Sequence, residues 1–445
     1  MRISIIDTSS LGDRSYLIDD GGVAVVVDPQ RDIDRVLALA AERDATITHV
    51  LETHIHNDYV TGGLELSRLV DAEYVVPAGD DVAYDRLPAR DGYVIEAGPM
   101  RFEVLHTPGH THHHVSYVLR HDTQTAVFTG GSMLHGTTGR TDLIGADDTE
   151  TLTHAQFHSV RRLAGELPDD TEVYPTHGFG SFCSATPASG DTSTIGEQRH
   201  TNPALTSDEE AYVENLLAAL SAYPAYYAHM GVINAAGPAP VDLTMPATVD
   251  PDELRRRIDT GEWVVDLRSR TAFAAGHLAG TLGFELSGSF VTYLGWLYQW
   301  GAPLTLIADD PKQIVEARRE LVRIGVDEVR GAATGAIDDM SAGSALRTYR
   351  VTDFTQLSSG IPSDATVLDV RQDSEYAESH VPGAVNIPLH ELLARAEEVP
   401  AGEVWVHCGS GYRASIAASI LDARNRTVVL IDDAFTNAVE LGLAA

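Results

Sequence analysis

Short apolar runs alternate with stretches of helical periodicity through residues 1–205. The apolar runs have the length of strands and are bounded by turn residues, whereas the periodic stretches repeat apolar residues every three or four positions. This alternation predicts an α/β fold. The predicted strands are residues 3–6, 23–28, 47–52, 74–76, 102–106, 115–119, 126–129 and 172–174, and the predicted helices are residues 32–43, 64–70, 149–166 and 208–222.

An internal repeat follows a proline-rich stretch, residues 231–251, which predicts a linker. Each copy of the repeat reads as a strand, a helix and a histidine–glycine turn leading into another strand, which predicts parallel α/β units. We therefore expect three parts: residues 1–246, residues 247–345 (the first copy) and residues 347–445 (the second copy). The recurring pairs share one spacing: Asp266 and Asp369, Arg268 and Arg371, Phe273 and Tyr376, His277 and His380, Gly280 and Gly383.

The composition narrows the classes of function. The net charge is −34, from 65 acidic and 31 basic residues, which makes nucleic acid a poor partner. The acidic residues are scattered and Lys312 is the only lysine, so we expect a halophilic surface. No apolar run reaches the ~20 residues of a membrane span and no signal peptide is recognisable, so a cytoplasmic protein is expected. With only Cys183 and Cys408, a disulfide framework is excluded.

Histidines concentrate in the first part of the chain. Nine of the nineteen lie between His49 and His121. Directly after a predicted strand, His54, His56 and Asp58 alternate, and alternate side chains of an extended segment share one face. Two imidazoles and a carboxylate at the end of a strand can converge on one cation.

Two further strand ends also carry histidine. A Pro-Gly turn places His110 after the predicted strand 102–106, and His177 follows the predicted strand 172–174. Three such strand ends predict an open metal site with free positions for substrate. We assign His54, His56 and His110 as ligands, with Asp58 and His177 as further candidates, and expect His112, His113 and His114 to lie on the surface or to support the ligands.

A cysteine loop marks the second copy. The predicted strand 403–407 runs into Cys408-Gly-Ser-Gly-Tyr-Arg413 and then into a helical stretch. A strand, a tight loop and a helix direct backbone N–H groups at one sulfur, and Gly409 and Gly411 permit the backbone angles that this requires. Together with the charge of Arg413, these features favour a thiolate, so Cys408 is predicted to be a nucleophile that carries a persulfide.

The first copy lacks this chemistry. Its corresponding strand, residues 304–307, ends in Ala308-Asp309-Asp310, with no cysteine and with carboxylates that would repel an anionic sulfur. Residues 247–345 are therefore expected to be catalytically silent and to serve packing or spacing. The other cysteine, Cys183, follows His177 on a glycine-rich loop, and two readings stay open: a thiol that relays sulfane sulfur and a small core residue.

These motifs resemble the metallo-β-lactamase fold family, whose HxHxDH motif is followed by Pro-Gly-His and Thr-His-Gly. The chain is similar in particular to persulfide dioxygenases fused to rhodanese domains, and the Cys-(x)4-Arg loop resembles a rhodanese sulfurtransferase. The resemblance implies an αββα metallo-β-lactamase sandwich followed by two rhodanese-like α/β domains. Further matching motifs are Thr129-Gly-Gly131, Gly139-Arg-Thr-Asp142, His177-Gly-Phe-Gly-Ser-Phe-Cys183 and Thr201-Asn-Pro-Ala204.

Two positions depart from the family pattern. Tyr59 stands where the family has a histidine, and Gly131 stands where it has an aspartate. The resemblance implies a mononuclear iron held at the positions of His54, His110 and Gly131. Because glycine has no side chain to donate, the third ligand must come from elsewhere, and a second metal is not expected.

For the third ligand, His56 is the first expectation, followed by Asp58 and His177. Fe(II) is the expected metal, with Zn(II) and loss of the metal as alternatives.

The resemblance implies a persulfide dioxygenase–sulfurtransferase. Such an enzyme oxidises a low-molecular-weight thiol persulfide to sulfite with O2 and transfers sulfane sulfur through Cys408, with thiosulfate as product or donor. The alternatives are a zinc-dependent thioester or lactone hydrolase with an appended rhodanese, and a metal-free scaffold that carries an active rhodanese. Neither membrane nor nucleic acid is expected as a partner, and the sequence leaves the carrier thiol and homo-oligomerisation open.

Overall fold

The strands of residues 1–175 are apolar on both faces. In β3 (Val23–Val27), Val25 and Val27 join one apolar core while Ala24 and Val26 join another. Because alternate side chains of a strand face opposite ways, each sheet must be covered on both sides. One sheet contains β1 (Arg2–Thr8), β2 (Asp13–Asp20), β3, β4 (Thr46–Leu51), β5 (Glu73–Pro77) and β6 (Leu87–Ala89), and the other contains β7 (Val94–Ala97), β8 (Met100–His106), β9 (Val115–His121), β10 (Gln124–Gly130) and β13 (Glu172–Pro175).

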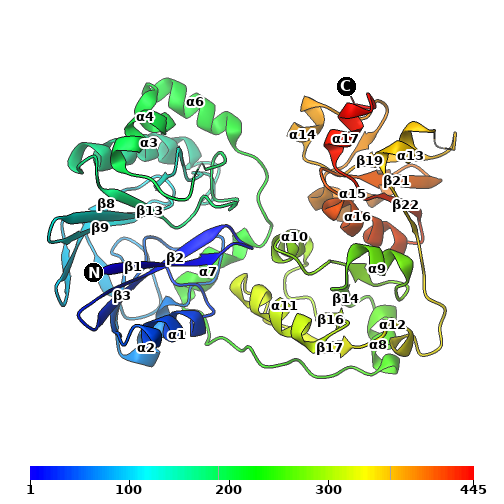
Figure 1. The fold of residues 1–445 in the computed structure, drawn as a ribbon, viewed down its shortest axis with the longest axis horizontal. Helices are drawn as coiled ribbons and strands as arrows, with labels where there is room; N and C mark the ends of the chain where they lie inside the picture. The colour runs from blue at the N-terminus through cyan, green and yellow to red at the C-terminus, as the bar shows by residue number, and fades with distance from the viewer. Residues whose placement is uncertain (189, 361, 445) are drawn as a thin grey trace. The chain divides into compact units, whose positions relative to one another are not determined.

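The two sheets pack face to face, and helices cover their outer faces (Figure 1). The central core includes Phe102 and Phe128 of the second sheet, packed with Tyr16 of the first. Apolar residues of the helices complete the two outer cores, which gives the predicted αββα sandwich. The helices over the first sheet are α1 (Asp34–Glu42) and α2 (Gly63–Val70), and those over the second are α3 (Thr149–Glu166), α4 (Ile195–Thr201) and α6 (Glu209–Ala219).

The computed structural model describes residues 1–188, 190–360 and 362–444, so residue 445 of the third predicted part lies outside the described residues. The chain divides into two compact units, Met1–Asp242 with Glu320–Gly325, and Leu243–Arg319 with Val326–Ala445. In the described ranges, no helix combines the length and the apolar character that crossing a bilayer requires.

Some elements differ from the sequence prediction. The strand β2 was not predicted, because polar residues at both ends of Asp13–Asp20 mask a short apolar centre, and the short strands β6 and β7 were not predicted either. The first residues of the predicted linker belong to a helix, α7 (Tyr227–Ala236), whose Asn234 is buried. Asn234 donates hydrogen bonds to the carbonyl groups of His56 and Tyr59, so this helix supports the histidine segment and does not act as a free linker.

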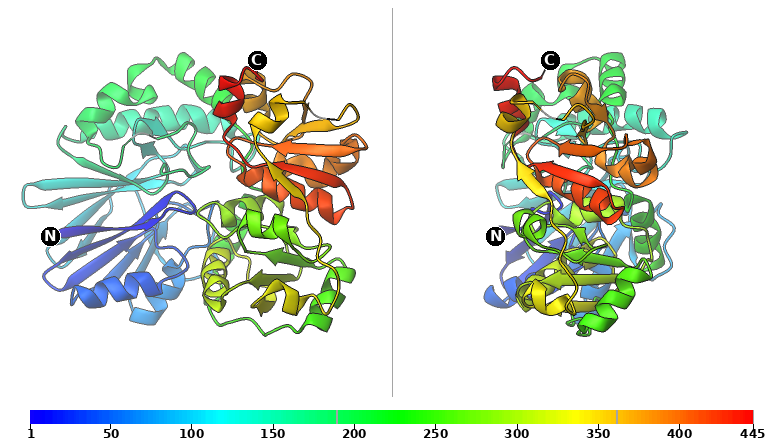
Figure 2. Two further views of the ribbon diagram at one scale, coloured as in Figure 1. Left: turned by 45° about the vertical axis from the view of Figure 1, so that its right-hand side comes forward. Right: turned by 90° about the vertical axis from the view of Figure 1, so that its right-hand side faces the viewer.

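The second unit contains two sheets in which every pairing is parallel, in accord with the α/β prediction (Figure 2). The first copy has β14 (Trp263–Asp266), β15 (Leu282–Gly283), β16 (Leu304–Ala308) and β17 (Val329–Thr334), with α8 (Pro251–Asp259), α9 (Arg270–Ala275), α10 (Phe290–Leu297), α11 (Pro311–Arg323) and α12 (Ile337–Met340). The second has β18 (Arg350–Thr352), β19 (Thr366–Asp369), β20 (Val385–Asn386), β21 (Glu403–His407) and β22 (Thr427–Ile431), with α13 (Phe354–Ser358), α14 (Asp373–Glu378), α15 (Leu392–Arg395), α16 (Tyr412–Ala423) and α17 (Phe435–Glu440).

The repeated residues make the same local contacts in both copies. Arg268 binds Asp266 and the carbonyl of Gly276, and Arg371 binds Asp369 and the carbonyl of Ser379 in the same way. The ring of His277 stacks on Phe273 with centroids 4.0 Å apart, and that of His380 stacks on Tyr376 at 4.1 Å. These matched contacts explain the sequence repeat as a repeated strand–turn–helix framework.

Candidate active sites

Three strand ends of the first unit bring histidines together. His54 follows β4, His110 lies in the turn after β8, and His177 follows β13. All three side chains are buried, and each offers one ring nitrogen within 4.8 Å of the corresponding nitrogens of the other two. Neutral imidazole nitrogens converging in this way are the donor set of a transition-metal site.

Hydrogen bonds fix the orientation of all three rings. The Nδ1–H of His110 donates to the carbonyl of Arg140 at 2.7 Å, and among the described residues its buried Nε2 has no partner. The hydroxyl of Thr53 donates to Asp28, so the Nδ1 of His54, 2.9 Å from that hydroxyl oxygen, is the donor of their hydrogen bond. Both rings therefore present an Nε2 lone pair, as metal-binding histidines do.

His177 faces the same point. Its Nδ1 lies 2.9 Å from Asp13 Oδ1 and 3.1 Å from Asp58 Oδ2, and its Nε2 lies 3.4 Å from the Nε2 of His54. Burial acts to lower the pKa of His177, but the carboxylates of Asp58 and Asp13 outweigh burial and raise it to about 10. Without a metal, a proton on Nε2 therefore separates the two imidazoles, and a metal would replace this proton.

His56, which the sequence favours as the third ligand, contacts a different group of side chains. Its Nε2 lies 3.0 Å from the hydroxyl of Tyr59 and 3.3 Å from carboxylate oxygens of both Asp28 and Glu52. Burial opposes its charge, but the two carboxylates raise the pKa of His56 to about 9. Its Nδ1 has no partner among the described residues. His56 belongs to two other groups of candidate ligands, one with Asp58 and His177 and one with Asp28 and Glu52.

Asp58 and Cys183 lie beside this cluster. The thiol of Cys183 is hydrogen-bonded to the Asp58 carboxylate, and both side chains are buried. Burial, with Asp58 and Asp13, raises the pKa of Cys183 well above its ordinary value. The thiol is therefore neutral at physiological pH.

Gly131 packs directly against a candidate ligand. A Cβ at this position would lie 2.2 Å from Cδ2 of His110. The N–H of Gly131 donates to Nε2 of His114 at 3.0 Å, and the ring of His114 stacks on that of His54. His114 is thus a buried support of the cluster, whereas His112 and His113 are exposed.

Two carboxylates of the site have no signature in the sequence. Asp13 contacts His177, and Asp28 accepts hydrogen bonds from Thr53 and from Thr176. Each stands at one end of a strand, Asp13 at the start of β2 and Asp28 directly after β3. An acidic residue at the end of an apolar strand was the available signal, and it is too common among turn residues to be selective.

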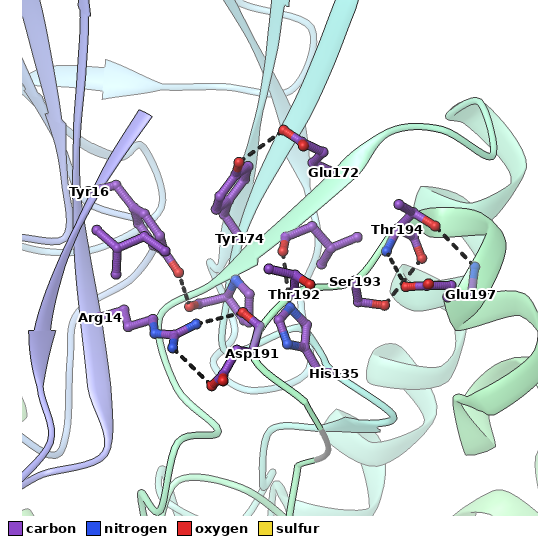
Figure 3. Close-up of a pocket in the computed structure, with 13 residues that line it drawn as sticks. Arg14, Tyr16, His135, Glu172, Tyr174, Asp191, Thr192, Ser193, Thr194 and Glu197 are labelled. Carbon is purple, nitrogen blue, oxygen red and sulfur yellow. Dashed lines mark hydrogen bonds and ion pairs between the residues drawn. The ribbon is translucent and has the colours of Figure 1, made fainter. Parts of the chain in front are cut away.

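A cavity of about 240 Å3 elsewhere in the first unit is not the metal site (Figure 3). It lies between β2 and β13, and none of the candidate metal ligands lines it. Its arginine, Arg14, is already bound to Asp191 and Asp7. With Glu172 and Glu197 also in the wall, this cavity has no free positive charge for an anionic substrate.

In the second unit, Cys408 follows β21 and precedes α16. Gly411 caps the helix at φ = +88°, and a Cβ there would lie 2.0 Å from Oδ1 of Asp432. The loop therefore requires glycine at this position. Cys408 is buried, at 1% relative exposure.

The positive charge of Arg413 is shared with a carboxylate. The guanidinium donates to both oxygens of Glu375 in α14, at 2.6 and 2.8 Å. Burial acts to raise the pKa of Glu375, but Arg413 lowers it overall. The positive charge that the sequence predicts at Arg413 is therefore part of an ion pair.

The first copy contributes side chains beside the Cys408 loop. Tyr293 of α10 packs its ring 5.7 Å from that of Tyr412, and the hydroxyl of Tyr412 donates to the carbonyl of Glu285 at 2.7 Å. Tyr293 is also close enough for Arg413 and Cys408 to affect its pKa, which burial raises. The first copy, predicted to serve packing or spacing, thus packs directly against the Cys408 loop.

Family models match two regions of the chain. Residues 13–177 match the metallo-beta-lactamase superfamily, and residues 353–440 match the rhodanese-like domain. The second match includes Cys408 and lies within the second copy. The assignment of the first copy as a rhodanese-like unit remains a proposal, supported by its matched contacts.

Individual relatives match parts of the chain. The persulfide dioxygenase ETHE1 of Homo sapiens mitochondria is 29% identical over 56% of this chain and 84% of its own. A hydroxyacylglutathione hydrolase of Pseudomonas aeruginosa is 36% identical over 32% of this chain and 51% of its own. The crystal structure of a metallo-beta-lactamase from Staphylococcus aureus aligns with a TM-score of 0.67 at 27% identity, covering 76% of this chain and 99% of the other. The chain therefore carries an N-terminal domain of the metallo-beta-lactamase superfamily, with persulfide dioxygenase homologues, and a C-terminal rhodanese-like domain.

Proposed function

We propose that this protein is a persulfide dioxygenase–sulfurtransferase acting on a low-molecular-weight thiol persulfide. The observation that carries the proposal is the presence, in one chain, of a buried histidine cluster with lone pairs facing one point and a glycine-rich loop around Cys408. A persulfide is a substrate that both sites could share. The 29% identity to a persulfide dioxygenase supports the same assignment.

The first reaction joins a persulfide, O2 and water to give a thiol, sulfite and two protons. Ferrous iron, when bound, would supply the redox chemistry of this oxidation. His54 and His110 would hold the metal, and the burial of these rings would keep bulk water away from a substrate bound there. The unpartnered Nε2 of His110 is the structural sign that a metal fits there.

The second reaction takes place on Cys408. Its thiolate attacks the sulfane sulfur of thiosulfate, the S–S bond breaks, and sulfite leaves with the bonding electrons. The resulting cysteine persulfide then passes its outer sulfur to an acceptor thiolate. The reverse direction, from a persulfide to sulfite, would produce thiosulfate.

A zinc hydrolase is the second candidate. Three neutral histidines form a ligand set found at catalytic zinc, which lowers the pKa of a bound water. The identity to hydroxyacylglutathione hydrolases supports this alternative over the shared segment.

Anaerobic purification followed by metal quantification and oxygen uptake tests the proposal. With glutathione persulfide we expect iron in the protein, O2 consumption and one sulfite for each O2 consumed. Zinc in the protein, no O2 uptake and cleavage of a glutathione thioester would instead establish the hydrolase.

A further inference from the structure

We infer that His177 replaces the missing carboxylate, so that the metal site consists of three histidines, His54, His110 and His177. This inference rests on the proposed function only in that the site holds a metal. The family pattern places an aspartate at position 131, and the structure gives that position to the ring of His110. Three observations lead to this assignment.

First, position 131 is closed to any side chain. A Cβ on Gly131 would lie 2.2 Å from Cδ2 and 2.7 Å from Nε2 of His110. The ring is held in place on its other side, where its Nδ1 donates to the carbonyl of Arg140 at 2.7 Å. An overlap of this size forces side chains off their preferred rotamers or shifts the backbone, and both are destabilising in a close-packed interior. A side chain at position 131 is therefore incompatible with the present position of the His110 ring.

Second, His177 lies where it can supply the third ligand in place of an aspartate. Its Nε2 lies 3.4 Å from that of His54, and its ring centroid lies 5.3 Å from that of His110. His56 does not join this group: its Nε2 faces Asp28 and Glu52, and among the described residues its candidate partners are Asp58 and His177 or Asp28 and Glu52, not His54 and His110. Of the alternatives for the third ligand, only His177 joins His54 and His110 in one group of candidate ligand atoms within the described chain.

Third, Asp13 and Asp58 hold His177 in the orientation that a ligand needs. Their carboxylates lie 2.9 and 3.1 Å from Nδ1, which directs Nε2 toward the other two histidines. A carboxylate behind a ligating histidine fixes its tautomer and increases its basicity. Asp13 is buried at the start of β2, so it acts as a positioning residue through His177.

A metal site with His177 as the third ligand also keeps negative charge near the metal. An aspartate ligand would place one negative charge directly on the metal. With a histidine in its place, the nearest negative charge is that of Asp58, one residue further out on the far side of the His177 ring; burial raises the pKa of the neighbouring Asp13 to about 7, so Asp13 contributes less charge. A divalent ion thus keeps nearby compensation in a buried site, where unpaired charge is costly.

The test measures metal affinity in the full-length protein, with Co(II) as an optical probe and anaerobic Fe(II) for stoichiometry. We expect wild type to bind one equivalent. We expect His177→Gln to lose at least about 100-fold in affinity and to change the visible Co(II) spectrum. We expect Asp13→Asn to lose about 10- to 100-fold. Exposed His112→Gln serves as the matched control and should bind as wild type does.

Two comparisons discriminate between ligand sets. If His56→Gln abolishes Co(II) binding while His177→Gln retains it, the inference is overturned. It is equally overturned if Gly131→Asp binds Co(II) more tightly than wild type, since the closed position predicts weaker binding. Circular dichroism and thiosulfate sulfurtransfer by Cys408 check that each variant is folded. If His177→Gln does not fold, the Co(II) affinity of Asp13→Asn tests the inference instead. An Asp13→Asn affinity equal to that of wild type would count against the inference.

The outcome also separates this inference from the proposed function. A wild-type protein that binds no metal overturns both. A protein that binds metal through His177 but consumes no O2 with a persulfide overturns the dioxygenase proposal alone.

Discussion

The two copies of the repeat share a framework but differ at one strand end. In the first copy Asp266 pairs with Ile307, and in the second Asp369 pairs with His407. When the two copies are aligned by this register, Ala308 corresponds to Cys408. The two loops then have equal length: Ala308-Asp-Asp-Pro-Lys-Gln313 and Cys408-Gly-Ser-Gly-Tyr-Arg413.

The loop of the first copy satisfies its own backbone. The N–H groups of Asp309 and Asp310 both donate to the side chain of Gln313, at 3.1 Å each. Pro311 opens the following helix, where the second copy has Gly411 with a positive φ. The N–H groups of Asp309 and Asp310 are therefore not available to bind an anion. The two copies thus share a framework and differ in the six residues of this loop, which is where we expect the difference in chemistry to arise.

The largest effect is expected from replacing Cys408 itself. Cys408→Ser removes the nucleophile, so we expect thiosulfate-to-thiol sulfurtransfer to fall by more than about 1000-fold. Oxygen uptake with a persulfide should continue at the wild-type rate, because the histidine cluster belongs to the other domain. The measurement is sulfite release from thiosulfate beside O2 consumption, and simultaneous loss of both would contradict two separate sites.

A substitution of Gly411 in the same loop is expected to have the second-largest effect. In Gly411→Ala, the Cβ would approach Oδ1 of Asp432 to 2.0 Å at a φ of +88°, so we expect about a 100-fold loss of sulfurtransfer. Pro311→Gly, at the matching position of the silent copy, is the control and should leave the rate unchanged. An active Gly411→Ala enzyme would show that the loop geometry is not needed.

The ion pair has a smaller effect. Glu375→Gln removes a negative charge that neutralises Arg413, so we expect the KM for anionic thiosulfate to fall about 3- to 10-fold at low salt. The pKa of Glu375 is lowered, so the carboxylate is ionised throughout neutral assays and the effect should be constant from pH 6 to pH 8. A rise in KM would mean that Glu375 serves mainly to orient Arg413.

The contribution of the first copy is expected to be the smallest. Tyr293→Ala removes the ring that packs near Tyr412, so we expect the KM for a bulky thiol acceptor to rise about threefold with little change in kcat. Tyr293→Phe keeps the ring and should restore the wild-type value. If the KM rises equally in both variants, the hydroxyl of Tyr293 and not its ring contributes to binding of the acceptor.

The architecture was predictable because its signals are local. Apolar strands such as residues 23–27, the alternation at His54 and His56, and the Pro-Gly turn before His110 each act within a few residues of sequence. The fold class and the rhodanese-like domain around Cys408 are confirmed.

The partners of these residues were not predictable. Whether His56 or His177 faces His54 depends on which carboxylate binds each ring, and Asp13 and Asp28 are distant in sequence from the histidines that they orient. The pairing of Arg413 with Glu375 depends in the same way on the packing of α14 against the loop. Such contacts follow from tertiary packing, which no periodicity encodes.

The contact between Gly131 and the His110 ring also limits which side chains position 131 accepts. A single codon change that introduced aspartate at position 131 would collide with His110, whose turn is itself constrained by Gly109 at φ = +144°, where a Cβ would meet Gln156. An aspartate at position 131 would need accompanying substitutions that move the turn and the ring together. An attempt to install that carboxylate in this protein would therefore have to exchange position 131 and the turn at residues 109–110 as one set.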